Sequence, residues 1–129
     1  MAQVKIYGTA ARLPGRRDAL SDVVHSCVVE AFAYPPEKRF HRFFALGEGD
    51  FRYPDDRSAD YTLIEIVMFE GRSIPAKKEL YRLLYARFEA ELGIAPIDLE
   101  ISLVETPRHD WGIRGVPGDA LGIGYRVEV

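Results

Sequence analysis

The spacing of apolar residues predicts an amphipathic helix in the first third of the chain. Its apolar positions recur every three or four residues, as on one face of a helix. These positions are Leu20, Val23, Val24, Cys27, Val28, Ala31 and Phe32. Pro35 and Pro36 cannot continue a helix, so we expect it to end just before them.

A second helix is predicted after the stretch "GRSIPAKK". Ser73 suits the N-cap position, Pro75 is tolerated in the first turn, and Gly93 is a good C-cap. The apolar face of this helix comprises Leu80, Leu83, Leu84, Phe88 and Leu92.

Four apolar stretches read as β-strands, one before and one after each predicted helix. They are "QVKIY" and "FHRFFAL" around the first helix, and "YTLIEIVMF" and "LEISLVE" around the second. The alternation of Leu63, Glu65 and Val67 fits the two-residue period of a strand better than the period of a helix.

The two halves of the chain align at an offset of 60 residues. The alignment pairs Arg12 with Arg72, Leu20 with Leu80, Phe32 with Leu92, Pro36 with Pro96, and Phe43 with Leu103. Each half reads β-α-β, which requires parallel strands and a right-handed crossover. The predicted fold class is therefore α/β (α+β): tandem β-α-β repeats forming a four-stranded mixed sheet with both helices on one face.

We expect a single domain over residues 1–129, with repeat halves at about 2–47 and 61–107. The linker "GEGDFRYPDDRSAD" is typical of a loop, and its acidic residues fit no calcium-binding spacing. The tail, residues 116–129, ends in the alternating stretch "GYRVEV", which we interpret as an edge strand added to a neighbour. Because the outer face of the sheet lacks a cover, we expect an oligomer.

The composition and net charge of the chain argue against several classes of protein. A formal net charge of -3 argues against a nucleic-acid partner, and 47% hydrophobic residues fit a globular protein. No apolar stretch is long enough to span a bilayer, and the start "MAQVKIYG" does not resemble a signal peptide. The single cysteine, Cys27, fits a reducing compartment, so we expect a cytoplasmic protein without a membrane partner.

The histidines and the cysteine suggest structure rather than chemistry. His25, His41 and His109 have no metal-ligand spacing, so we expect no metal site and no cofactor. His25 flanks the apolar helix face and is interpreted as a partly buried structural histidine. Cys27 lies on that face and is expected to be inert.

The stretch "EGRS" places Arg72 between a strand and a helix N-terminus. An arginine there can bind a carboxylate bidentately, and the free N–H groups of the helix add positive potential. The alternative is an intramolecular bridge from Arg72 to an acid such as Glu70 or Asp110. The sequence leaves both interpretations open.

The stretch "ETPRHDWGIRG" follows the last predicted strand and holds Trp111, the only tryptophan. We interpret it as a pocket wall, a subunit contact, or both. The indole N–H of Trp111 needs a hydrogen-bond partner, and Gly112 and Gly115 permit a turn. Arg108 or Arg114 can form an ion pair with a neighbouring acidic residue.

Together these features resemble the tautomerase superfamily, in its malonate semialdehyde decarboxylase-like branch. The resemblance rests on the repeated β-α-β unit, the helix with His25, "GR" before the second helix, "ELGIAPIDLEISLVETP" and the following "DW". It covers about residues 2–115. It implies a homotrimer, an amino-terminal proline as catalytic base or acid, and arginines that hold a substrate carboxylate.

Several residues depart from the pattern that this resemblance implies. Ala2 stands at the position of the catalytic proline, and Lys38 stands at that of a carboxylate that assists water. Glu70 and Arg72 occupy the two arginine positions, so only Arg72 keeps the residue type. Trp111 matches the family's tryptophan, whereas Ile113 replaces an aromatic residue.

Because Met1 precedes Ala2, the Ala2 nitrogen is an amide, which cannot act as a base. The catalytic residue is therefore unknown from the sequence; Glu37 is a conceivable acid, and Tyr7 or Tyr53 a conceivable proton donor. We expect a homotrimer that binds a small anionic keto- or enol-carboxylate near Arg72 and Trp111, with tautomerase- or decarboxylase-like activity that does not use a proline. The alternatives are a non-catalytic trimeric binding or scaffold protein and, less favoured, a ferredoxin-like regulatory module.

Overall fold

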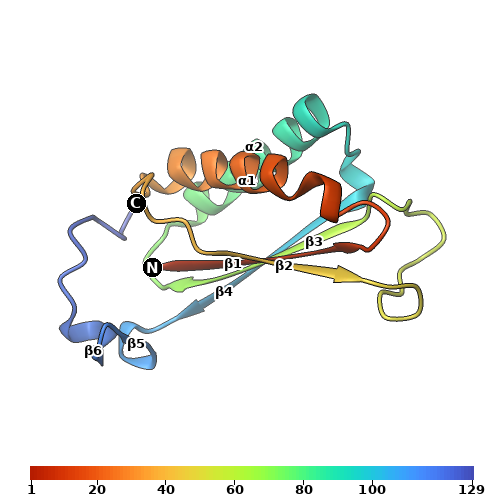
Figure 1. Cartoon of the computed structure of the whole chain (residues 1–129). Coiled ribbons are helices and arrows are strands. Elements are labelled where there is room, and N and C mark those ends of the chain that lie inside the picture. The colour runs from red at the N-terminus through yellow and green to blue at the C-terminus, as the bar shows by residue number, and fades with distance from the viewer.

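The computed structural model describes residues 1–129 and has two layers, a sheet and a pair of helices that cover one of its faces (Figure 1). The main elements are β1 (Ala2–Thr9), α1 (Arg17–Phe32), β2 (His41–Leu46), β3 (Thr62–Phe69), α2 (Ile74–Leu92) and β4 (Leu99–Thr106). Two short strands, β5 (Gly112–Ile113) and β6 (Val116–Pro117), form a separate hairpin.

The sheet has the strand order β2-β1-β3-β4. Strands β1 and β2 are parallel, as are β3 and β4, whereas β1 and β3 run antiparallel down the centre. This arrangement confirms the predicted pair of β-α-β units in a four-stranded mixed sheet. The antiparallel register pairs Ala2 with Met68, so the start of β1 lies beside the end of β3.

The helix ends follow the predicted signals. The Ser73 hydroxyl accepts a hydrogen bond from the Ala76 N–H at 3.2 Å, and α2 ends at Gly93 with a left-handed φ of 66°. Helix α1 ends at Ala33, which also adopts a left-handed conformation with φ 47°. Pro35 follows two residues later, as expected for a helix that must stop.

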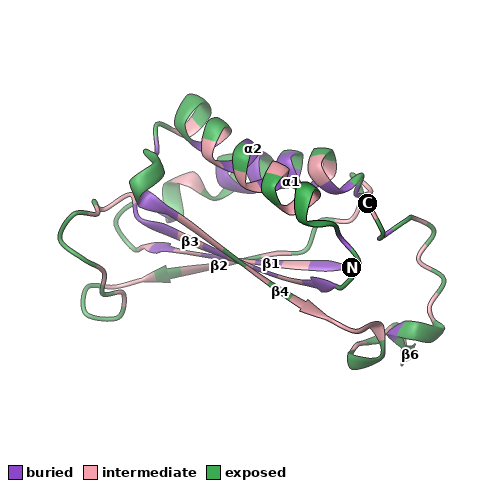
Figure 2. Cartoon of the chain, turned by 180° about the vertical axis from the view of Figure 1, so that it is seen from behind, coloured by how far each residue is buried: buried purple, intermediate pink, exposed green.

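The core lies between the helices and the inner face of the sheet. Figure 2 shows that buried residues line the central strands and the underside of both helices. The largest fully buried side chains of this core are Phe32, Phe88, Ile6, Leu20, Ile64, Ile66, Met68, Leu80, Leu84, Ile94 and Leu99. Their burial is the main stabilising contribution to the fold.

The outer face of the sheet is uncovered, but it is less apolar than the sequence suggested. The side chains of Lys5 and Glu65 lie opposite each other in its centre, where β1 pairs with β3. Tyr7 stacks on Phe44 at a ring distance of 4.7 Å, and Val104 remains 42% exposed. The face therefore combines apolar positions with a polar centre.

Within one chain the end of the tail forms no strand, and the edge strand added to a neighbour stays a prediction. Residues 121–129 have no regular secondary structure and fold back over their own chain. Val127 is fully buried against Met1 and Phe69, and the Ser73 N–H donates a hydrogen bond to the Val129 oxygen at 2.9 Å. Within one chain the tail thus packs against the molecule's own surface.

The first half also contains the buried histidine and cysteine. His25 is 5% exposed, and its Nε2 lies 2.6 Å from the Pro36 oxygen, which confirms a structural histidine that ties helix α1 to the following turn. Cys27 is fully buried, and burial raises the pKa of its thiol, as expected for an unreactive cysteine. Neither helix has the length and apolar character needed to cross a membrane.

Candidate functional site

The candidate site lies where the end of β3, the start of β1 and the tail meet. The Phe69 N–H donates a hydrogen bond to the Met1 carbonyl oxygen at 3.1 Å, which extends the β1–β3 pairing to the first residue. Arg72 lies three residues after Phe69 in the sequence, just beyond the end of β3. Both ends of the chain lie at this end of the sheet (Figure 1).

Arg72 points into the protein instead of toward solvent. The residue is 4% exposed, and its Nη1 donates a hydrogen bond to the Phe69 carbonyl oxygen at 3.0 Å. Its guanidinium carbon lies 5.2 Å from the centre of the Phe32 ring. No carboxylate lies within ion-pair distance, so the suggested bridges to Glu70 or Asp110 are absent.

Two of the three Arg72 guanidinium nitrogens, Nε and Nη2, are buried without a hydrogen-bond partner. Burial lowers the pKa of the guanidinium. A buried charged donor without a partner carries its full desolvation cost, and an arriving anion would remove that cost. The planar fork of an arginine matches a carboxylate in particular.

Two tyrosines complete the surroundings of the amino terminus. The Ala2 N–H donates a hydrogen bond to the Tyr34 hydroxyl at 3.2 Å, and the Met1 amino group donates one to the Tyr125 hydroxyl. The two rings meet edge to face at 5.4 Å. Burial raises the pKa of both phenols, so both hydroxyls are protonated at neutral pH and can donate hydrogen bonds.

The amino group of Met1 is strongly perturbed. Its pKa is lowered to about 4, chiefly by burial and then by the positive charges of Arg72, Lys38 and Arg108. The amine is therefore neutral at neutral pH and retains its lone pair. The same three cations that disfavour an ammonium ion favour an anion.

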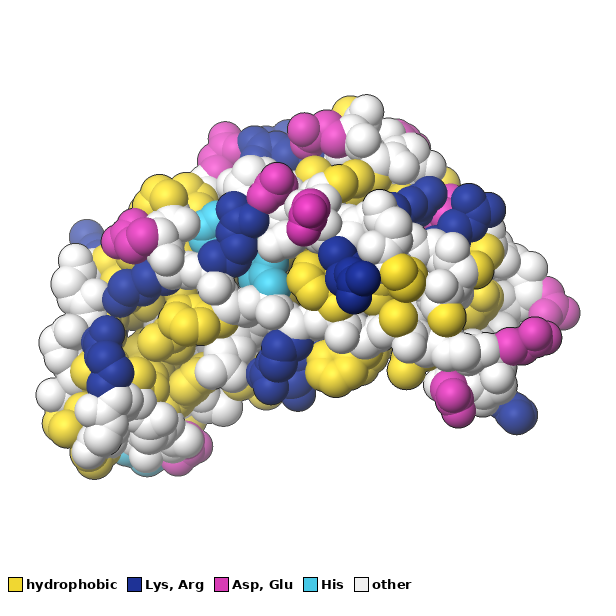
Figure 3. Space-filling model, viewed as in Figure 1, with side chains coloured by type: hydrophobic (Ala, Val, Ile, Leu, Met, Phe, Trp, Pro, Cys, Tyr) yellow, Lys and Arg dark blue, Asp and Glu magenta, His cyan; other side chains and the backbone are white.

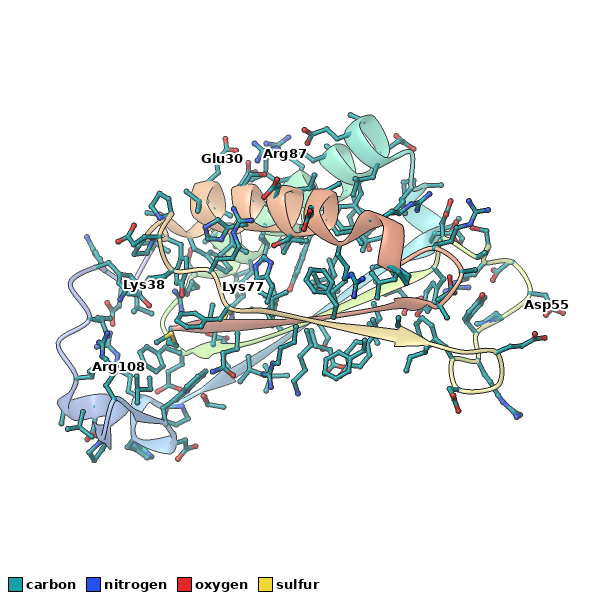
Figure 4. All side chains as sticks on the ribbon, in the orientation of Figure 1. Glu30, Lys38, Asp55, Lys77, Arg87 and Arg108 are labelled. Atoms are coloured by element: carbon teal, nitrogen blue, oxygen red, sulfur yellow. The ribbon has the colours of Figure 1, made fainter.

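Lys38 and Arg108 approach this site from two different segments. The Lys38 ammonium donates a hydrogen bond to the Ile123 carbonyl at 3.2 Å and lies 4.8 Å from the centre of the Tyr125 ring. Arg108 lies 3.3 Å from the Glu128 carboxylate. Figure 4 labels Lys38 and Arg108 on the same side of the molecule, and Figure 3 shows Lys and Arg side chains gathered there.

Trp111 packs against Phe69, the residue whose carbonyl binds Arg72. Its indole Nε1 donates a hydrogen bond to the Thr106 hydroxyl at 2.6 Å, and its ring meets the Phe69 ring edge to face at 5.3 Å. Trp111 thus finds the partner that its N–H was expected to need. Arg72 and Trp111 are linked through Phe69 rather than by direct contact.

Of the suggested substitutes for the catalytic proline, Tyr7 and Tyr53 lie away from this site, whereas Glu37 is the sequence neighbour of Lys38. Glu37 is exposed, and Tyr7 faces the outer side of the sheet, stacked on Phe44. Tyr53 belongs to an aromatic cluster with Tyr61 in the linker at the opposite end of the sheet. Nor does any group of three metal-ligating side chains converge in the protein.

Sequence reasoning missed two groups that the structure brings to the Met1 amine: Tyr34 and Tyr125. Tyr34 follows helix α1 directly, and its neighbour Pro35 drew attention only as a helix stop. Tyr125 lies in "GIGYR", a stretch without a recognisable motif. A buried contact across more than a hundred residues leaves no local signal.

Comparison with known proteins identifies the family. Residues 38–114 match the family described as "Tautomerase enzyme". The chain is 34% identical over 97 residues to the Bacillus subtilis (strain 168) protein named "Probable tautomerase YrdN", covering 71% of this chain and 74% of that protein.

Solved structures agree. A malonate semialdehyde decarboxylase, described with decarboxylase and hydratase activities, superposes with a TM-score of 0.78 at 28% identity over 86% of this chain and 89% of that one. A fused 4-OT that forms an asymmetric trimer shares the fold, with a TM-score of 0.80 at 21% identity over 93% of this chain and 98% of that one. The chain therefore belongs to the tautomerase family.

Proposed function

We propose that this tautomerase-family protein binds a small keto- or enol-carboxylate through Arg72. The observation that carries the proposal is the buried guanidinium with two unpartnered nitrogens and no carboxylate nearby. Lys38 and Arg108 add positive charge, and the Met1 amine stays neutral between them. Trp111 acts indirectly in this proposal, by fixing Phe69, whose carbonyl holds Arg72.

Any turnover proceeds without an amino-terminal proline, since residue 2 is alanine. The group at the site with a free lone pair is the Met1 amine, whose pKa of about 4 makes it a weak base at neutral pH. The hydroxyls of Tyr34 and Tyr125 supply hydrogen bonds to a substrate oxygen. We expect slow tautomerase- or decarboxylase-like turnover at most.

A second candidate is a non-catalytic protein that binds a small carboxylate or acts as a scaffold. It is favoured by the absence of any cavity lined by Arg72 or either tyrosine. Phenylenolpyruvate, an enol-carboxylate, separates the two. Ketonisation above the uncatalysed rate, lost in Arg72→Met, supports an enzyme; binding without turnover supports the second candidate.

Binding itself is tested by calorimetric titration with pyruvate, a small keto-carboxylate. We expect a millimolar dissociation constant. A charge-assisted pair contributes about 1.5–3 kcal/mol, so Arg72→Met should weaken binding ten- to hundredfold. Arg12→Met, at the equivalent position of the first half, is the matched control and should leave binding unchanged. Equal affinities in Arg72→Met and the parent chain would show that Arg72 is structural.

We also propose a homotrimer. The uncovered outer face of the sheet, with Val104 exposed, supplies apolar area for association, and the fused 4-OT with the same fold is a trimer. Sedimentation equilibrium at micromolar concentration should give a mass three times the 14.6 kDa of the chain. A monomer mass would contradict the proposal.

A further inference from the structure

The tail, residues 121–129, contacts nearly every group of the candidate site. The Ile123 carbonyl accepts from Lys38, the Tyr125 hydroxyl accepts from the Met1 amine, and Glu128 pairs with Arg108. These three contacts come from one short segment. In Figure 1 the tail runs from the β5–β6 hairpin across the ends of the strands to the end of helix α1.

The tail also closes the site to solvent. Val127 is fully buried against Met1 and Phe69, and Arg72 is 4% exposed. An open hollow of about 570 Å³ adjoins the sequence neighbours of Arg72 but lies on the solvent side of the tail. It is lined by Glu70, Gly71, Pro107, Arg108, His109, Asp119 and Glu128. An anion in that hollow could not reach the unpartnered Arg72 nitrogens while the tail is in place.

A close backbone approach seats the tail. Gly71 has a left-handed φ of 131°, and a Cβ built on it would lie 3.2 Å from the Val127 Cγ1. A side chain at residue 71 would therefore be strained and would press on Val127. The chain between β3 and α2 is shaped to receive this valine.

The tail is held mainly by side-chain packing rather than by backbone pairing: Val127 is its one buried residue, and Tyr125 and Val129 are only partly buried against the core. It has no strand or helix, and its one backbone hydrogen bond to the strand–helix layer joins Ser73 to Val129. Its ion pair is largely exposed, since the Glu128 side chain is 61% exposed. Segments with few buried contacts open at low free-energy cost, unlike the core strands.

We infer that residues 121–129 form an autoinhibitory strap that competes with the carboxylate ligand for the Arg72 site. The inference rests on the proposed function. Tyr125 lies near Arg72, where its hydroxyl accepts a hydrogen bond from the Met1 amine, and Glu128 supplies the carboxylate for Arg108. A ligand must displace these groups, so the apparent affinity is the intrinsic affinity reduced by the fraction of molecules with the strap open.

The test weakens the strap in the full chain without adding charge. Val127→Asn places an amide in the apolar contact with Met1 and Phe69, outside the main core. Ile97→Asn, at a 49% exposed position in the short turn between α2 and β4, is the matched control. Pyruvate binding is measured by calorimetry, and strap opening by the rate of trypsin cleavage after the exposed Arg126, followed by mass spectrometry.

We expect Val127→Asn to bind pyruvate at least about fivefold more tightly than the parent chain and to be cleaved faster at Arg126. Saturating pyruvate should accelerate cleavage of the parent chain, because the bound ligand holds the strap open. Ile97→Asn should match the parent chain in both measurements.

Three results would overturn the inference. Unchanged pyruvate affinity in Val127→Asn with faster cleavage would mean that the strap opens without covering the site. Protection of Arg126 by pyruvate would make the strap a lid that closes over the ligand. Absence of pyruvate binding in both proteins would overturn the proposed function together with the competitive role of the strap, whereas either of the first two results would leave the proposed function standing.

Discussion

The two ends of the sheet place equivalent arginines in opposite surroundings. Arg12 follows β1 and Arg72 follows β3, at the same position of the repeat. The Arg12 side chain is 55% exposed and lies 3.8 Å from the Asp60 carboxylate, which also pairs with Arg16 at 2.9 Å. Arg72 is 4% exposed and has no carboxylate within ion-pair distance.

The difference shows how the same repeated unit can place an ion-paired arginine at one end of the sheet and a candidate ligand-binding arginine at the other. The linker that enters β3 supplies Asp60 to the first end, where solvent screens the pair and its contribution is small. At the second end Met1, Tyr34 and Tyr125 surround the arginine, and none of them is negatively charged at neutral pH. Positive charge there is left for a ligand.

The largest expected effect concerns the equivalent residues at the ends of the two helices, Phe32 and Leu92. Phe32 is fully buried under the Arg72 guanidinium, whereas Leu92, its equivalent in α2, is half-buried. Phe32→Ala should lower the free energy of unfolding by about 3–5 kcal/mol, because it leaves a cavity in the core. Leu92→Ala should cost less than about 2 kcal/mol. Urea unfolding monitored by circular dichroism checks both, and equal losses would contradict the difference in packing.

The second effect is the pH dependence that His41 contributes, for which the second half has no equivalent group. Burial, His25 and Arg39 lower the pKa of His41 to about 4, and its equivalent in the second half is Ile101. The unfolded chain therefore takes up a proton at higher pH than the folded chain. The contribution of His41 to stability is complete above about pH 6.5 and falls as the pH drops toward 4, by about 1–3 kcal/mol.

This pH dependence is measured as the free energy of unfolding between pH 7 and pH 4. His41→Gln should flatten the part of the curve that His41 contributes, while His109→Gln, at an exposed histidine, should follow the parent curve. A slope that persists unchanged in His41→Gln would assign it to other groups.

The third prediction concerns a variant that places a carboxylate beside Arg72, as Asp60 lies beside Arg12. In Tyr125→Glu an internal carboxylate would occupy the guanidinium, so pyruvate binding should weaken at least about tenfold, equivalent to about 1.4 kcal/mol. Asp60→Asn is the converse change. It should create no new pyruvate site, because Arg12 is solvated and no second group assists it. Calorimetric titration with pyruvate measures both variants. Binding by Tyr125→Glu as tight as that of the parent chain would contradict the prediction.

The smallest effect compares the helix ends. Ala33 and Gly93 are equivalent, and both adopt a left-handed conformation, with φ of 47° and 66°. Because that conformation is strained for alanine, Ala33→Gly should raise the free energy of unfolding by about 0.5–1 kcal/mol, and Gly93→Ala should lower it by a similar amount. Thermal unfolding of the two single variants measures both changes. A loss of stability in Ala33→Gly would contradict the strain assigned to Ala33.

Local signals predicted the elements and their arrangement. Ser73, Gly93 and Pro35 marked helix ends through the hydrogen-bonding and steric preferences of single residues, and the offset of the two halves defined the topology. The outer face was predicted less well, because the interpretation weighed its apolar residues and overlooked the central Lys5 and Glu65. The packing of the tail on its own chain was not predicted, because alternation fits such burial as well as it fits a strand added to a neighbour.

The sequence by itself determined the β-α-β repeat, the family, and Arg72 as a candidate, since each depends on neighbours along the chain or on a pattern of residue types. Only the tertiary structure decided that Arg72 is buried and lacks a carboxylate. That outcome depends on the antiparallel pairing of β1 with β3, which brings Met1 to Phe69, and on the tail, which returns Tyr125 across 124 residues. Contacts between segments so distant arise from packing of the whole chain, and no local period or motif encodes them.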